Sequence, residues 1–167
     1  VTISCWVSQK AKKSPKTFTP YQDKDSLDRQ IKRELEKSKH SPKNAIVIGS
    51  LGRVGSGVID LCEKMSIKMT KWDILETSKK QDFSEILDHD LFFNCVVANK
   101  ETPTFISEGI IQRNQNLTIV GDIACDPGSK YNPIAIYDAV TTWSEPVARV
   151  SENPILEVMA IDNLPSL

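Results

Sequence analysis

Short apolar runs alternate with amphipathic segments along most of the chain. Residues 45–48 are a continuous apolar run, typical of a strand buried on both faces of a parallel sheet. From residue 53 to residue 65, apolar side chains recur at helical spacing, which predicts a helix directly after that strand. The same criteria predict further strands at 67–72, 91–97, 117–120 and 155–161, and helices at 25–39, 83–87 and 104–112. This alternation predicts an α/β fold of the Rossmann type, a doubly wound and mostly parallel sheet with helices on both faces.

The first 24 residues do not follow this alternation. Residues 1–7 are apolar enough for a short edge strand, whereas residues 10–20 are polar and contain two prolines. The abrupt apolar start indicates that the chain begins inside a longer protein. We therefore expect an N-terminal arm over residues 1–24 and one domain over residues 25–167.

Charge is distributed unevenly along the chain. Residues 1–43 hold 11 of the 21 Lys and Arg residues but only 5 of the 22 Asp and Glu residues. A basic arm of this kind can contact nucleic acid or an acidic partner. The aromatic side chains that interleave a nucleic-acid surface are missing, so we expect no nucleic-acid partner.

Composition narrows the class of protein further. No stretch of 18 apolar residues predicts a membrane span, and no apolar run followed by a cleavage site predicts a signal peptide. The four cysteines have no C-x-x-C spacing, so we expect no metal site. Reduced, buried thiols are the rule in the cytoplasm, which is where we expect this protein.

A glycine-rich loop, Gly-Ser-Leu-Gly-Arg-Val-Gly-Ser-Gly, connects the first predicted strand of the domain to the helix after it. Gly49 would allow the sharp turn off the strand, and a bare Gly52 would let a pyrophosphate approach the backbone. Either Gly55 or Gly57 would let the helix pack closely on the strand. This G-x-x-G-x-x-G spacing is a variant of the dinucleotide fingerprint. By itself it leaves open a glycine-rich turn without a ligand.

Asp73 strengthens the dinucleotide interpretation. It ends the second predicted strand, 18 residues after Gly55, where an acid that binds ribose is expected. Its carboxylate would accept hydrogen bonds from the ribose hydroxyls and repel a 2′-phosphate, which favours NAD over NADP. Arg53 favours a ligand with phosphates, because a guanidinium pairs with pyrophosphate oxygens. An S-adenosylmethionine-dependent methyltransferase shares this pattern, and a non-enzymatic interaction module is a third hypothesis.

Three other strand ends are candidates for ligand contacts. Cys95 is placed to line the adenine or ribose pocket or to pack in the core, and Asp162 to hydrogen-bond the nicotinamide carboxamide. Asp126 is placed to meet a cationic substrate or to begin a Pro-Gly turn. Neither His40 nor His89 lies at a predicted strand end. Hydride transfer usually needs a proton donor, so we expect the acid/base residues outside this chain.

Five blocks of sequence, in this order, carry a resemblance to a known family: AIVIGSLGRVGSGVIDLC, KWDILET, FFNC, NPIAIY and IDNLPSL. From residue 25 to residue 167 the chain resembles fungal saccharopine dehydrogenase. That family uses NAD to oxidise saccharopine to L-lysine and 2-oxoglutarate in the α-aminoadipate pathway of lysine biosynthesis. The resemblance implies a cofactor-binding domain. The catalytic Lys and His of the family lie on another domain that is missing here, so the chain alone would be inactive.

The resemblance also assigns residues to the cofactor. These are Gly52, Arg53 and Val54 at the pyrophosphate, Asp73 and Thr77 at the adenosine ribose, Cys95 and Ile123 in the pocket wall, and Asp162 at the nicotinamide end. One departure affects the chemistry. The family often has Cys where this chain has Val54, so a thiol pairing with Cys95 is absent.

Overall fold

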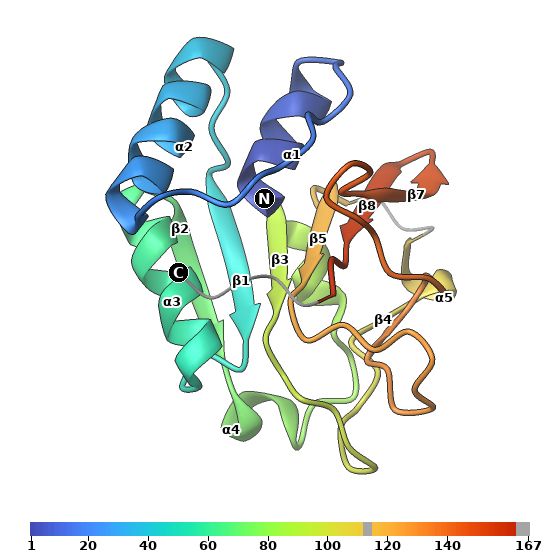
Figure 1. Ribbon diagram of the computed structural model, residues 1–167. Helices are drawn as coiled ribbons and strands as arrows, with labels where there is room; N and C mark the ends of the chain where they lie inside the picture. The colour runs from blue at the N-terminus through green and yellow to red at the C-terminus, as the bar shows by residue number, and fades with distance from the viewer. Residues whose placement is uncertain (112–114, 163–167) are drawn as a thin grey trace.

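A six-stranded sheet forms the centre of the chain in the computed structural model, which describes residues 1–111 and 115–162. The strand order is β2-β1-β3-β5-β8-β7 (Figure 1). Every neighbouring pair is parallel except the β7–β8 hairpin. The strands are β1 (Asn44–Ile48), β2 (Lys68–Trp72), β3 (Leu91–Asn94), β5 (Ile119–Asp122), β7 (Ala148–Glu152) and β8 (Ile155–Met159). Two short strands, β4 (Ile106–Ser107) and β6 (Ile134–Ala135), form a second, parallel sheet.

Helices flank this sheet on both faces, which confirms the predicted fold class. They are α1 (Thr2–Lys10), α2 (Lys24–Ser38), α3 (Arg53–Lys64), α4 (Ile74–Thr77), the 3₁₀ helix η1 (Ser84–Asp88) and α5 (Glu108–Ile111). Apolar side chains of α1, α2 and α3 share one core cluster with the sheet. The opposite cluster contains side chains of η1, α5, β4 and β6. The helices of this second face are short, and connecting loops complete its cover (Figure 1).

Strand β1 shows why its sequence is apolar at every position. Ala45 and Val47 point into the cluster beneath α1–α3, whereas Ile46 and Ile48 point into the opposite cluster. All four side chains are fully buried. Successive side chains of a strand face opposite sides, so a strand covered on both faces needs a continuous apolar run. The prediction for this strand is confirmed.

The predicted edge strand over residues 1–7 is wrong, because these residues begin helix α1. Ile3, Cys5 and Trp6 are buried against the sheet, in the same core as α2 and α3. The first turn of α1 sits close over β5. A Cβ on Gly121 would lie 2.6 Å from Thr2 Oγ1. The β propensity of this segment is a weak preference, and packing against the sheet overrides it. The boundary between arm and domain at residue 24 stays a prediction.

The other differences between the predicted and the observed helices and strands are confined to single elements. The predicted helix over residues 104–112 is instead β4 followed by the single turn α5, and residue 112 lies outside the described residues. The strand predicted at 155–161 ends at Met159, and Ile161 makes only an isolated bridge to Thr141. Three elements had no strong pattern and were not predicted: α4, β6 and β7.

The order of strands creates a crevice beside β1. The chain passes from β1 through α3 to β2, and then through α4 and η1 to β3 on the other side of β1. Connections that leave a central strand in opposite directions leave a crevice at its carboxyl end, where open α/β sheets bind ligands. The glycine loop and α4 lie at this end of the sheet, at the bottom of Figure 1.

Candidate cofactor cleft

The geometry of the glycine loop explains two of its glycines. Gly49 has a φ of 90°, and a Cβ there would lie 2.9 Å from the carbonyl carbon of Cys95. A Cβ on Gly55 would lie 2.1 Å from the carbonyl oxygen of Gly49, whereas a Cβ on Gly57 meets nothing within 4 Å. Gly55 is therefore the glycine that lets α3 pack closely on β1, and Gly57 is not.

Backbone amides tie this loop to the end of β2. The amides of Gly49 and Ser50 both donate to the carbonyl oxygen of Trp72, at 3.0 and 3.1 Å. The next amide, that of Leu51, donates to Asp73 Oδ2 at 2.8 Å. The carboxylate of Asp73 therefore helps to hold the loop in its shape.

Asp73 also begins helix α4. Its Oδ1 accepts the amide of Ile74 at 2.9 Å, and its own amide donates to Glu76 Oε2 at 2.7 Å, which completes a capping box. Thr77 Oγ1 donates to the carbonyl oxygen of Asp73 at 2.9 Å. The acid predicted to bind ribose thus has a structural role as well.

These segments enclose a cleft of about 570 Å³ at the carboxyl ends of β1 and β3. Five of the predicted site residues line it together: Gly49, Gly52, Asp73, Thr77 and Cys95. The loop after β3 supplies further lining residues between Val96 and Phe105. They were not predicted for the site, because the pattern assigned the two ends of this segment to a strand and a helix.

The other predicted residues lie outside the lining of this cleft. Arg53 and Val54 are exposed in the first turn of α3. Ile123 lines a separate apolar cavity of about 130 Å³ beside α1. Asp162 is exposed after β8, and the carbonyl of Asp126 closes a turn in the loop after β5.

Cys95 is a wall residue with an inert thiol. Burial raises its pKa from 9.0 to about 12, and the nearby Asp122 carboxylate acts in the same direction. The thiol is therefore protonated at neutral pH, whereas nucleophilic cysteines are thiolates. Cys95 can contact a ligand through packing but is not activated for attack.

A buried polar network behind the cleft was missed at the sequence level. Asp122 ends β5 with 1% of its surface exposed, and its oxygens accept Asn94 Nδ2 at 2.8 Å and Tyr137 Oη at 2.6 Å. Burial raises the pKa of Asp122, while these two donors oppose the shift. Burial, together with the bond to Asp122, also raises the pKa of Tyr137. Asn94 Oδ1 in turn accepts the amide of Val96 at 3.2 Å, so the network holds the cleft wall.

Neither a histidine nor a lysine is among the described residues that line the cleft. His89 is buried near the start of β3, at the other end of the sheet, where it contacts Thr70 Oγ1 at 2.8 Å and the carbonyl of Glu85 at 3.0 Å. His40 is exposed after α2. Both histidines thus precede a strand and do not follow one.

The cleft has the features that a dinucleotide needs. Gly52 is the N-cap of the 12-residue helix α3, and it has no side chain to cover the first amides of that helix. Such amides lack partners within the helix, and the helix dipole favours an anion there. Asp73, the acid at the end of β2, lines the same cleft. These residues fit NAD.

No helix within residues 1–111 and 115–162 is long and apolar enough to cross a membrane. The same residues contain no group of three or more His, Cys, Asp or Glu side chains placed to hold a metal ion.

Several known proteins with similar sequences share one name. The chain is 41% identical to saccharopine dehydrogenase (NAD+, L-lysine-forming) of Candida albicans, over 89% of this chain and 42% of that protein. It is 37% identical to the enzyme of the same name from Schizosaccharomyces pombe, over 99% of this chain and 49% of that enzyme. The Yarrowia lipolytica enzyme is 36% identical over 86% of this chain and 40% of its own length. No family model matches the chain.

The strand order and the glycine loop define a Rossmann-type α/β domain. The similarity to several fungal enzymes, at 36–41% identity, confirms the resemblance seen in the sequence. This chain is a homologue of part of fungal saccharopine dehydrogenase, an NAD-dependent oxidoreductase by name. It spans less than half the length of these relatives.

Proposed function

We propose that this chain is the NAD-binding domain of a saccharopine dehydrogenase, which oxidises saccharopine to L-lysine and 2-oxoglutarate. The observation that carries the proposal is the meeting of the glycine loop, Asp73 and Thr77 in one cleft. The α3 amides and Arg53 would hold the pyrophosphate, and Asp73 the adenosine ribose. When bound, NAD would supply the hydride acceptor. The name of the relatives supports the assignment of reaction and substrate.

The remaining site residues extend the proposal. Cys95 would line the cofactor pocket together with Ile123, the residue that follows β5, and Asp162 would lie at the nicotinamide end. Asp126 is the candidate contact for a cationic part of the substrate. Lysine and histidine side chains are lacking among the described cleft residues, so we assign proton transfer to a second domain.

Exposed apolar side chains around the cleft fit a covering domain. Leu51, Ile74, Leu75 and Val97 are each at least 70% exposed, and they belong to the glycine loop, α4 and the loop after β3. Clustered apolar surface of this kind marks interaction sites.

The four cysteines are free, which supports a cytoplasmic enzyme.

Calorimetric titration tests the cofactor assignment. NAD should bind the isolated chain with a Kd on the order of micromolar to millimolar, as is common for enzyme substrates. Asp73→Ala should weaken NAD binding about tenfold or more, equivalent to roughly 1.4 kcal/mol. Asp60→Ala, a change at an exposed acid on α3, should leave it unchanged.

Two further measurements make the outcome clear. Urea unfolding of Asp73→Ala shows whether the lost loop contact to Leu51 also lowers stability. S-adenosylmethionine is titrated as the competing ligand class. Binding of S-adenosylmethionine without NAD would replace the proposal with the methyltransferase hypothesis. Binding of neither ligand would remove its main support.

A further inference from the structure

A series of hydrogen bonds runs from the wall of the cleft to Tyr137, a residue just after β6. Asn94 ends β3 and Asp122 ends β5, and the two residues are paired neighbours in the sheet. Asn94 Oδ1 accepts the amide of Val96 at 3.2 Å, and Asn94 Nδ2 donates to Asp122 Oδ1 at 2.8 Å. The other oxygen of Asp122 accepts Tyr137 Oη at 2.6 Å. Val96 lines the cleft, whereas the other three are not among the described residues of its lining.

Chemistry fixes the direction of each bond in this series. A backbone amide can only donate, so the Asn94 side chain must turn its oxygen to Val96 and its NH2 group to Asp122. An ionised carboxylate can only accept, so Asp122 takes one of these donors on each oxygen. Asn94 and Asp122 are 0% and 1% exposed, and an unpartnered polar group is costly at such depth. A change at Tyr137 therefore acts on the bond that holds Val96.

We propose, on the basis of the proposed NAD function, that this series positions the cleft wall for the cofactor, with Tyr137 as its outermost positioning residue. Cys95 and Val96 directly follow Asn94, and both line the cleft. The amide of Cys95 donates to the carbonyl oxygen of Ile48 at 2.9 Å, so this wall lies beside the end of β1. A displacement of Asn94 would move the wall there. Binding sites lose affinity when the residues that support their walls are loosened.

The substitution Tyr137→Phe removes one hydroxyl at the far end of the series and keeps the ring. Tyr131→Phe is the matched control, because Tyr131 precedes β6 and its hydroxyl makes no hydrogen bond within residues 1–111 and 115–162. Calorimetric titration should show NAD binding weakened about three- to tenfold in Tyr137→Phe and unchanged in Tyr131→Phe. Amide hydrogen exchange should become faster at Val96 in Tyr137→Phe and not in the control.

An exchange of two side chains separates positioning from a general loss of stability. Asn94→Asp alone sets two carboxylates against each other in place of a 2.8 Å hydrogen bond, and NAD binding should weaken by about tenfold or more. Adding Asp122→Asn restores every bond. The carboxylate at position 94 then accepts the amide of Val96 and the NH2 group at position 122, whose oxygen still accepts Tyr137 Oη. This double variant keeps the net charge and should bind NAD within about threefold of the native chain.

Urea unfolding gives the folded fraction of each variant, so that every dissociation constant refers to folded protein. Native NAD affinity in Tyr137→Phe would overturn the inference, as would a double variant that regains stability without regaining NAD affinity. If Asn94→Asp does not fold, the comparison of Tyr137→Phe with Tyr131→Phe decides. A native chain that binds no NAD would contradict the proposed function and this inference together, and the native titration alone identifies that case.

Discussion

Among single residues, the clearest constraint in this cleft is the absence of a side chain at one glycine. Gly55 lies in the first turn of α3, where the helix approaches the loop that follows β1. Gly57 lies two residues further along α3, and a Cβ there would face open space. The sequence left these two glycines as equal candidates for the packing position. Only the distances between helix and loop separate them.

The pair Gly55→Ala and Gly57→Ala tests this assignment. A Cβ at residue 55 would collide with backbone atoms of Gly49, so α3 must move away from the loop. We expect a loss of about 1–3 kcal/mol in the free energy of unfolding, as for other overpacked sites, together with weaker NAD binding. Gly57→Ala should gain about 0.5–1 kcal/mol, because alanine is the better helix residue. Urea unfolding measures both, and equal effects of the two variants would contradict the structure.

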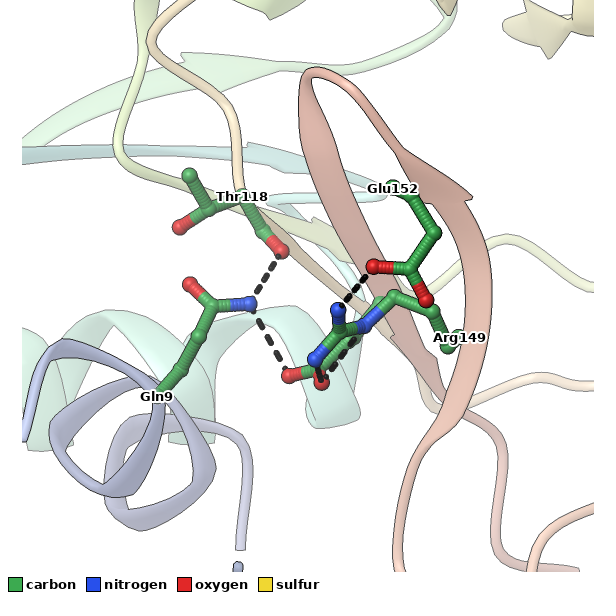
Figure 2. Close-up of polar contacts among 5 residues, drawn as sticks. Gln9, Thr118, Arg149 and Glu152 are labelled. Carbon is green, nitrogen blue, oxygen red and sulfur yellow. Dashed lines mark hydrogen bonds and ion pairs between the residues drawn. The ribbon is translucent and has the colours of Figure 1, made fainter. Parts of the chain in front are cut away.

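In addition to its apolar contacts, helix α1 is attached to the sheet by a polar network around Gln9 (Figure 2). Gln9 Nε2 donates to the carbonyl oxygen of Thr118 at 3.1 Å and to Glu157 Oε2 at 2.9 Å. Glu157 is buried, and its other oxygen accepts two nitrogens of Arg149, Nε at 3.0 Å and Nη2 at 2.7 Å. Arg149 also pairs with Glu152 at 2.8 Å. One side chain of α1 thus completes the partners of a carboxylate on β8.

Substitutions of Gln9 should therefore weaken the attachment of the whole of helix α1 to the sheet and lower the free energy of unfolding. Gln9→Ala should cost about 1 kcal/mol, the usual net value of such a hydrogen bond. Gln9→Glu should cost more, because it places a second carboxylate against buried Glu157. Gln30 is a matched control on α2, where it bonds only Glu34 at 2.8 Å. Gln30→Ala should change the unfolding free energy by at most about 0.5 kcal/mol. A ranking with Gln30→Ala as the most harmful change would disprove this account of α1.

Across the whole molecule, buried thiols make stability depend on pH. Cys5 on α1 and Cys62 on α3 are fully buried, and burial raises the pKa of each from 9.0 to about 12. The folded state therefore keeps protons that the unfolded chain releases above pH 9. The stabilising contribution is complete below pH 9 and is lost as the pH rises from 9 toward 12.

Unfolding free energies measured in urea at pH 8, 9 and 10 check this dependence. Stability should fall above pH 9, with each thiol contributing roughly 1 kcal/mol per pH unit. Lysine and tyrosine also titrate in this range, so the decisive comparison is with Cys62→Ala. That variant should show a shallower decline than the native chain. Identical slopes would mean that Cys62 does not contribute.

Much of the central sheet and the glycine loop follows from local sequence. A strand covered on both faces must be apolar at every position, and residues 45–48 satisfy that condition without reference to the rest of the chain. The turn off β1 requires a glycine at Gly49, and the acid Asp73 follows at the end of the next strand. These features depend on local backbone geometry and on the spacing of apolar residues along the chain. Both can be read from a single sequence.

Tertiary contacts decided the features that the pattern missed. The first residues of the chain form α1 because the sheet buries one side of them and Gly121 allows a close approach. Asp122 and Tyr137 meet although 15 residues separate them, and no spacing in the sequence signals that bond. The sequence by itself determined the apolar strands, the glycine loop and the acid beside it, because those depend on local conformation. The place of α1, the choice of Gly55 over Gly57 and the buried network behind the cleft depend on distances between distant segments, which only the folded chain defines.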